Sequence, residues 1–335
     1  MVKRDNATVS APGKVLLLGE YAVLEGAVAL VSSVSRRVFV GTSNLSAAHN
    51  LAPEVREAHI LARSAYGLPD LAWPELDVAS LYSGDQKLGL GSSAAAAVAA
   101  AGRSAQAAGA NLADADVKER LFDLAFAAHR AVAPQGSGAD VAASAFGGTL
   151  RVRRTLPSES AVTESPHTAT ARLEVEALAW PTDLGVGVVW TGTPVRTSSM
   201  VEALSRYASA EHAAYAALMA NLKELAWQGA QSFYAGQSAG VIEAVRGYGE
   251  GLRALGQAAQ LPIYTERLNA LARAAAELGL VAKPSGAGGG DVAVVFYQDK
   301  QAFERLRTRL NEVGCQYLDA EVHVEGVRSE PQAHG

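Results

Sequence analysis

The stretch Lys87-Leu88-Gly89-Leu90-Gly91-Ser92-Ser93 runs directly into an alanine-rich segment, residues 94–101. Glycines let the backbone turn tightly and expose consecutive N–H groups, and the alanines favour a helix whose N-terminus carries the positive end of its dipole. No acidic residue intervenes between Asp85 and Asp114. Because unpaired N–H donors and a nearby lysine attract anions, the stretch predicts a phosphate-binding loop at a helix start.

Three other interpretations compete with this one. Residues 89–94 match the G-x-G-x-x-A dinucleotide fingerprint, but the preceding residues 82–86 are polar where a buried strand is needed, and no acid stands at the ribose-binding distance. A Walker A loop is excluded because no Gly-Lys-Ser/Thr ends the run. An ordinary loop that caps a structural helix stays open for this stretch taken alone.

Composition and charge narrow the class of protein. The chain has 335 residues, 49% of them hydrophobic, which is enough for one large domain or two lobes with a substantial core. A formal net charge of −5 gives no general attraction to nucleic acid or to an anionic membrane. Cys315 is the only cysteine, and no signal peptide or bilayer-spanning run is apparent, so we expect a cytoplasmic protein.

Apolar periodicity predicts a β-rich start, a helical middle and an alternating end. The expected strands are residues 7–11, 15–18, 27–31, 37–42, 76–78, 146–152, 185–190, 281–283, 292–297 and 321–324. The expected helices are residues 53–66, 92–108, 114–132 and 301–313, with helical patterns through 197–259 and 265–278. This pattern is typical of an α+β protein with two lobes.

A lobe boundary is expected in residues 153–170, which are rich in Ser, Thr, Glu and Pro and lack clear periodicity; a long hairpin loop is the alternative. The predicted lobes are residues 1–170 and 171–328. Residues 329–335 are expected to form a frayed tail.

Two further stretches carry candidate chemistry. Ala11-Pro12-Gly13-Lys14-Val15-Leu16-Leu17-Leu18-Gly19-Glu20-Tyr21-Ala22-Val23 places Lys14 just after an expected turn, where a lysine is either simply solvated or able to stabilise a reacting oxygen. Lys283-Pro284-Ser285-Gly286-Ala287-Gly288-Gly289-Gly290-Asp291 is a second glycine loop, too rich in glycine for an average hairpin. Two glycine loops and a lysine at a turn suggest polyphosphate chemistry.

In chain order, residues 11–23, 87–93 and 283–291 resemble motifs one, two and three of the GHMP small-molecule kinase superfamily. The details are most similar to its phosphomevalonate kinase family, through Gly19-Glu20-Tyr21-Ala22-Val23-Leu24-Glu25-Gly26, the loop at 87–93, Gly136-Ser137-Gly138-Ala139-Asp140-Val141-Ala142, Trp190-Thr191-Gly192 and the loop at 283–291. The resemblance implies a two-lobed fold, with an N-terminal lobe like ribosomal protein S5 domain 2 and a ferredoxin-like C-terminal lobe. It also implies transfer of the ATP γ-phosphate to phosphomevalonate.

Related activities are the alternatives. Mevalonate kinases, by the same resemblance, carry His after the motif-one Glu and a magnesium-binding Glu eleven residues before the catalytic Asp, where this chain has Tyr21 and His129. Diphosphomevalonate decarboxylases have Ala in place of Gly91. A non-catalytic ligand sensor of the same fold is a further alternative, against which Lys14, Ser93 and Asp140 count.

Residue roles follow from the resemblance. Lys14 and Asp140 are the implied catalytic residues, with Asp140 either a base or chiefly a positioning group, because a phosphate monoester oxygen is already largely ionised. The implied nucleotide contacts are Lys87, Gly89, Leu90, Gly91, Ser92, Ser93 and Ala94, with Ser93 also on Mg²⁺. The implied substrate contacts are Glu20, Tyr21, Ser137, Gly138, Arg196, Ser198, Lys283, Ser285, Gly286, Ala287 and Gly288.

Several of these assignments have plainer alternatives. Asp140 followed by Val-Ala-Ala also suits a helix N-cap. Among candidate cations for the acceptor phosphate, Arg196 and Lys87 rank above Arg130. His129 is expected to pack or cap a helix, and no second ligand at metal spacing suggests zinc. The adenine pocket is expected within residues 44–83. Besides ATP, Mg²⁺ and phosphomevalonate, we expect no nucleic-acid or membrane partner, and a monomer or homodimer.

Overall fold

The computed structural model describes residues 8–42, 51–155, 172–192 and 197–331. The described chain divides into two compact units. The first unit comprises Met1–Val15, Ser32–Thr149 and Ala320–Gly335, and the second comprises Leu16–Val31 and Leu150–Asp319. None of the helices in the described ranges combines the length and the apolar character that a bilayer crossing requires.

The elements follow one another in a mixed order of strands and helices. The strands are β1 (Val9–Leu18), β2 (Val28–Thr42), β3 (Pro74–Asp77), β4 (Tyr82–Ser83), β5 (Gln86–Lys87), β6 (Thr149–Thr155), β7 (Arg172–Leu178), β8 (Gly185–Trp190), β9 (Val281–Pro284), β10 (Val292–Tyr297), β11 (Gln316–Leu318) and β12 (Arg328–Ser329). The α-helices are α1 (Pro53–Ala65), α2 (Ser92–Ala107), α3 (Ala115–Val132), α4 (Ala139–Phe146), α5 (Thr197–Ala210), α6 (His212–Tyr234), α7 (Ser238–Ala258), α8 (Glu266–Ala276) and α9 (Lys300–Arg309). Short 3-10 turns are η1 (Ala22–Glu25), η3 (Ala79–Leu81) and η5 (Leu310–Val313).

Three sheets organise these strands. One has the order β12-β1-β2-β6-β7 with β3 on β2, the second β11-β8-β10-β9, and β4 pairs with β5. Strands β1 and β2 are long, and along their length each passes from one unit into the other.

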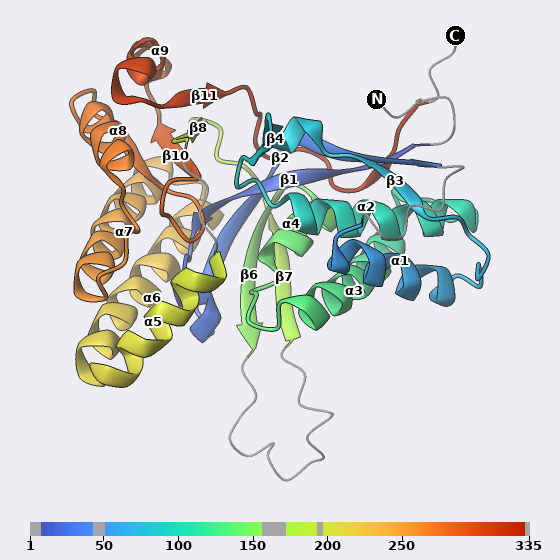
Figure 1. Ribbon diagram of the computed structural model, residues 1–335. Helices are drawn as coiled ribbons and strands as arrows, with labels where there is room; N and C mark the ends of the chain where they lie inside the picture. Colours follow the sequence, from blue (N-terminus) through green and yellow to red (C-terminus); the bar gives the residue numbers. More distant parts are fainter. Residues whose placement is uncertain (1–7, 43–50, 156–171, 193–196, 332–335) are drawn as a thin grey trace. The chain divides into compact units, whose positions relative to one another are not determined.

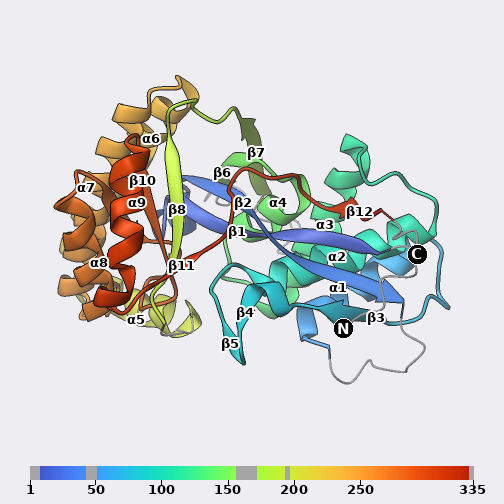
Figure 2. The ribbon, with the colours of Figure 1, turned by 90° about the horizontal axis from the view of Figure 1, so that it is seen from above.

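In the first unit, helix α2 is the centre of the packing. Its alanines at 94–101 are all buried, and it contacts α1, α3 and α4. Small side chains around the whole helix allow such close neighbours, since a helix that is apolar all round belongs in a core. Helices α1 to α4 lie on one side of β1 and β2, which pass in front of α1 and α2 in the second view (Figures 1 and 2). The start of α2 is thereby fixed in place.

In the second unit, a small sheet packs on helices. Val189, Ala293 and Val295 of the sheet form one apolar cluster with Leu268 and Leu271 of α8, joined by Phe303 of α9. Figure 1 shows α6 and α7 running side by side, in agreement with the extensive contact between them.

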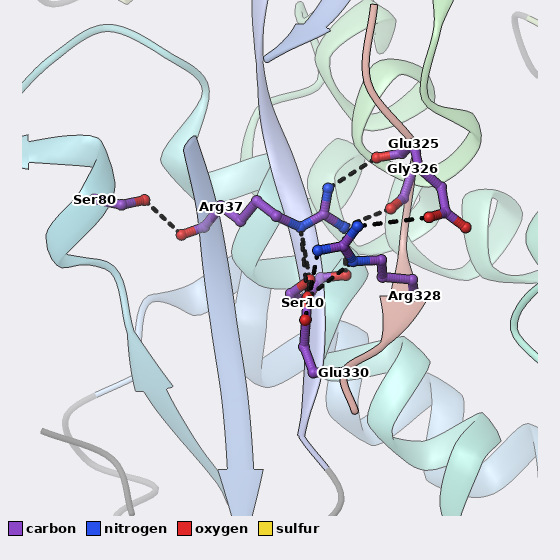
Figure 3. Close-up of polar contacts among 7 residues, drawn as sticks. All are labelled: Ser10, Arg37, Ser80, Glu325, Gly326, Arg328 and Glu330. Carbon is purple, nitrogen blue, oxygen red and sulfur yellow. Dashed lines mark hydrogen bonds and ion pairs between the residues drawn. The ribbon is translucent and has the colours of Figure 1, made fainter. Parts of the chain in front are cut away.

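The C-terminal segment, residues 320–330, belongs to the first unit, and buried Arg37 holds it there (Figure 3). Arg37 Nη1 donates to the Glu325 carbonyl (2.8 Å), Nη2 to the Gly326 carbonyl (2.6 Å) and Nε to Ser10 Oγ (2.6 Å). Ser10 Oγ in turn contacts the Glu330 carboxylate. Burial lowers the pKa of Arg37 to about 10, which leaves it charged near neutral pH.

We predict that Arg37→Met destabilises the chain by about 3–5 kcal/mol, because it leaves the Glu325 and Gly326 carbonyls and Ser10 without the buried donor groups of Arg37, while Glu330 keeps its contact with Arg328. Arg37→Lys should recover part of this, since a lysine keeps the charge but cannot donate in several directions at once. Urea unfolding of both variants measures the difference. A loss below about 1 kcal/mol in Arg37→Met would mean that the other contacts of the segment hold it without Arg37.

Burial of the His59 side chain, on α1, makes the free energy of unfolding depend on pH. Its side chain is fully buried against Trp73, with ring centroids 4.9 Å apart. Burial, and then the charge of Arg103, lower the pKa of His59 from 6.5 to about 4. Neutral His59 therefore favours the folded state above pH 6.5, and this contribution is lost as the pH falls towards 4.

We expect His59→Phe to lose less unfolding free energy than the wild type between about pH 7 and pH 4.5, because only the wild type must keep this buried imidazole neutral. Urea titrations of both proteins at the two pH values measure this. Equal pH sensitivity of the two proteins would show that His59 does not resist protonation.

The structure differs from the expected elements in the strands. The strands expected at 7–11 and 15–18, on either side of Pro12-Gly13, correspond to the single strand β1 (Val9–Leu18), because the Lys14 N–H bonds outward to the Leu90 carbonyl (2.8 Å) without interrupting it. The strands expected at 27–31 and 37–42 likewise correspond to the single strand β2 (Val28–Thr42). Strands β4, β5, β7 and β11 were not expected, and the strand expected at 321–324 is replaced by isolated bridges at Val322 and at the following Glu325.

The helices and boundaries differ less. The helical pattern at 197–259 divides into α5, α6 and α7; α6 ends before Gly236, whose φ of 68° leaves the helical region. The two units do not follow the predicted lobes 1–170 and 171–328, since the chain returns to the first unit after residue 319. Ser329, placed in the expected tail, pairs with Val9 in β12–β1.

Candidate active site

The predicted phosphate-binding loop, residues 87–93, leads into the start of α2, so the helix begins where the sequence predicts. Gly89 and Gly91 both have positive φ values, 78° and 77°, and Gly91 is the N-cap of the helix. No side chain caps the first turn and no acid lies in it, so the first N–H groups of α2 have no partner from its cap. This is the geometry of an anion site at a helix N-terminus.

Gly91 is where the two predicted catalytic side chains meet. A Cβ atom added to Gly91 would lie 3.0 Å from Lys14 Cγ and 3.7 Å from Asp140 Cβ. The absent side chain of Gly91 therefore leaves the space in which Lys14 and Asp140 approach the helix start. The Lys14 N–H also donates to the Leu90 carbonyl (2.8 Å), which fixes strand β1 to the loop.

Helix α4 carries Asp140 to this place. Its N-cap is Gly138, with φ 80°, and Asp140 is its second residue, so the alternative that Asp140 caps the helix is wrong. Asp140 Oδ1 accepts from the Val141 N–H (3.0 Å). Ser144 of the same helix donates to the Pro12 carbonyl of β1 (2.8 Å), so α4 and β1 are held together close to Lys14 and Asp140.

His129 makes a contact that the sequence did not predict. We expected it to pack or cap a helix; its side chain is mostly buried, and its Nε2 also lies 3.7 Å from Asp140 Oδ2. The helical pattern of α3 gave no sign of this, because the contact crosses the loop between α3 and α4. Arg130, the next residue, lies over the Phe126 ring, 5.8 Å from its centroid.

A cavity of about 370 Å³ adjoins the phosphate loop within the first unit. Lys87, Ser92 and Ser93 line it, together with Val55 and Tyr82. The remaining lining residues are Leu51, Ala52, Glu54, Pro74, Glu75, Leu76, Val78 and Ala96. Most of them fall within residues 44–83, where the adenine pocket is expected, and residues 43–50 lie outside the described residues.

Two of the predicted nucleotide contacts have no side chain available to a ligand. The Leu90 side chain is buried and its carbonyl is occupied by Lys14, and Ala94 is fully buried in the α2 core. Exposed Lys87 and the half-buried Ser92 and Ser93 keep their side chains available to a ligand.

Glu20 and Lys283, both predicted substrate contacts, form a buried ion pair within the second unit. Neither side chain is exposed, and Lys283 Nζ also donates to the Pro284 carbonyl (2.7 Å). Tyr248 donates to the Glu20 carbonyl (2.6 Å), and its own burial raises its pKa. The ion pair joins the stretch at residues 11–23 to the loop at residues 283–291. Because both side chains are fully buried and paired, we do not retain either residue as a substrate contact.

The other predicted residues of motif three are also engaged within the second unit. Ser285 Oγ accepts from the Leu16 N–H (2.7 Å), and Tyr21 donates to the Ala287 carbonyl. A Cβ on Gly288 would lie 2.5 Å from the Ile263 carbonyl, so only glycine fits this close approach. Gly286 shares the loop, with φ 99°.

Some predicted residues cannot be placed fully. Arg196 lies outside the described residues, and Ser198 is described only as part of α5. Ser137 lies just before α4, where its Oγ accepts from the Ala139 N–H (3.3 Å). Within the described ranges, no group of three or more His, Cys, Asp or Glu side chains gathers as a metal-binding cluster.

Comparison with known proteins defines the class first. The model "GHMP kinases N terminal domain" matches residues 59–148, and "GHMP kinases C terminal" matches residues 241–314. The chain thus carries regions similar to both the N-terminal and the C-terminal domain of GHMP kinases, the class that its predicted phosphate-binding loop had indicated.

Individual relatives are more specific. The chain is 28% identical over 370 residues to phosphomevalonate kinase of Streptomyces sp. (strain CL190), covering 95% of this chain and 97% of that protein. A Lin0012 protein from Listeria innocua matches with a TM-score of 0.81 and 24% identity over 97% of this chain and 99% of its own. Streptococcus pneumoniae phosphomevalonate kinase, solved with phosphomevalonate and AMPPNP, matches with a TM-score of 0.76 and 22% identity over 94% and 99%.

Proposed function

We propose that this chain is a phosphomevalonate kinase, which transfers the γ-phosphate of ATP to (R)-5-phosphomevalonate and releases ADP and 5-diphosphomevalonate. The main structural support for this reaction is that the side chains of Lys14 and Asp140 both lie beside Gly91 at the start of α2. The acceptor is inferred from the similarity to the Streptomyces enzyme along nearly the whole of both chains.

The loop suits the phosphates of ATP. Phosphoryl transfer depends mainly on in-line positioning and charge neutralisation, with little covalent help from the protein. The free N–H groups at the start of α2 bind the phosphate oxygens, and exposed Lys87 adds positive charge beside Ser92 and Ser93. The adjoining cavity takes the nucleoside. We propose the cytoplasm, where ATP is available, as the compartment.

Mg²⁺ fits this site only as a partner of the phosphates. Magnesium usually keeps several waters and is bound through few protein groups and the substrate phosphates, which agrees with the lack of a carboxylate cluster among the described residues. When bound, it neutralises charge on the transferred group, and the Ser93 hydroxyl would be its protein ligand.

Lys14 and Asp140 have complementary roles. The Lys14 ammonium stabilises charge on the group in transfer, since a fixed cation in a partly buried site acts more strongly than one in water. Asp140 orients the attacking phosphate oxygen and fixes Lys14. It need not remove a proton, because a phosphate monoester carries a charge of about −1.5 to −2 at pH 7.

A panel of acceptors tests the proposal. ADP release is measured with mevalonate, phosphomevalonate and diphosphomevalonate offered separately, while CO₂ is monitored. We expect turnover with phosphomevalonate alone and no CO₂. Turnover with mevalonate would indicate a mevalonate kinase, and CO₂ from diphosphomevalonate a decarboxylase. Absence of turnover with all three would leave a ligand-binding protein of the same fold.

A further inference from the structure

The imidazole of His129 is built into the candidate active site. Its Nε2 faces Asp140 Oδ2 at 3.7 Å, and the exposed fractions of the two side chains are 12% and 25%. The second carboxylate oxygen, Oδ1, is already held by the Val141 N–H. His129 Nδ1 is buried and has no hydrogen-bond partner among the described residues. The ring therefore has one polar contact, and that contact is the proposed catalytic carboxylate.

The loop between α3 and α4 is shaped around this ring. A Cβ on Gly136 would lie 3.2 Å from His129 Cε1, so a larger residue there would press on the imidazole. Gly136 N–H donates to the Ala133 carbonyl (3.0 Å), and Ala133 N–H donates to the His129 carbonyl (2.8 Å). These bonds fold the loop back over α3 and hold the ring beside Asp140.

The negative charges at this site indicate what the imidazole of His129 can contribute. A phosphorylated acceptor brings between one and two negative charges to a site that already holds the Asp140 carboxylate, and like charges a few ångströms apart repel. Charged groups near the ring include Asp140 from α4, which it contacts, Lys14 from β1, which like Asp140 lies beside Gly91, and the adjacent Arg130, which lies over Phe126. A protonated imidazole changes the net charge of the His129–Asp140 pair from −1 to zero.

We propose that His129 is a positioning and specificity residue, which orients Asp140 through Oδ2 and, when protonated, neutralises it as a phosphorylated acceptor approaches. The inference rests on the proposed function. It accounts for how a carboxylate can lie beside an acceptor that is itself an anion. An uncharged alcohol acceptor would gain much less from the same pair.

A charge series at position 129 tests this. The variants are His129→Asn, which keeps a donor but cannot protonate near neutral pH, and His129→Glu, which adds a negative charge. We expect the KM for phosphomevalonate to rise by about tenfold or more in His129→Glu relative to His129→Asn, with the KM for ATP changed less. Asp123→Asn, an exposed charge change on the same helix, is the matched control.

The pH profile separates positioning from simple packing. The KM ratio of His129→Asn to wild type should be larger at low pH than at high pH, because an imidazole can carry a proton and an asparagine side chain cannot. Because both enzymes are assayed with the same acceptor at each pH, protonation of the acceptor phosphate affects both KM values equally and does not change their ratio. Thermal unfolding confirms that the variants are folded.

Two results would overturn the inference. One is a KM ratio that does not change with pH, and the other is an equal acceptor KM in the Asn and Glu variants. Both require a wild type that phosphorylates phosphomevalonate. A wild type without that turnover would instead contradict the proposed function, which the panel of acceptors detects independently.

Discussion

Asp140→Asn and Lys14→Met are each expected to lower kcat by about 10²- to 10³-fold, the loss typical of removing one preorganised charged or donor group from a reaction site. Asparagine keeps the shape of Asp140 and its contact with Val141, and methionine keeps most of the Lys14 stem beside Gly91. Each change therefore removes charge with little loss of packing.

The two alanine variants extend the same prediction. Asp140→Ala and Lys14→Ala should also lose most of kcat while remaining folded, because both side chains are only partly buried and the Lys14 N–H bond to Leu90 involves the backbone. Steady-state kinetics with thermal unfolding measure both effects, and Glu119→Ala, an exposed change on α3, is the control. Near-normal turnover in any Lys14 or Asp140 variant would remove that residue from the chemistry.

Lys283→Met is expected to destabilise the chain by about 3–5 kcal/mol, because it leaves the Glu20 carboxylate buried and without its cation. Glu20 Oε2 already has no hydrogen-bond partner within the described residues, so no second group there can compensate. Lys283 is fully buried, and its contacts within the second unit join motif one to motif three.

The double variant Glu20→Gln, Lys283→Met should recover part of this loss, since two neutral side chains of similar size remove the unpaired charge. Urea unfolding of both single variants and the double variant gives the coupling free energy. If the double variant lost the full sum of the single losses, the two residues would act independently and the ion pair would not explain their burial.

Local sequence signals predicted the helices well and the distant contacts poorly. Helices α1, α2, α3 and α8 begin and end within two residues of the expected ranges, because apolar periodicity and a run of alanines are local properties. Strand β7 was missed although Leu173 and Val175 alternate with glutamates, a pattern typical of a strand. The lobe boundary expected in residues 153–170 drew attention away from this pattern. Strand β12 has only two residues, too few for any pattern.

The site shows the same limit. Glycines at 89 and 91 predicted the phosphate loop from local chemistry alone, and the structure confirms the helix start there. The approach of Asp140 to Lys14 was expected only through family resemblance, since the two residues lie 126 positions apart in the sequence. The contact of His129 with Asp140 depends on the path of one loop. The pairing of Glu20 with Lys283 depends on burial, which the separate motifs do not reveal.

The most direct test of the central claim is ³¹P NMR of the wild-type chain with ATP, Mg²⁺ and phosphomevalonate. The proposal predicts that the monoester signal of the acceptor disappears and a new diphosphate appears in step with ADP, with Asp140→Asn showing almost no conversion over the same time. An acceptor signal that stays unchanged while the wild type is folded and binds ATP would contradict it.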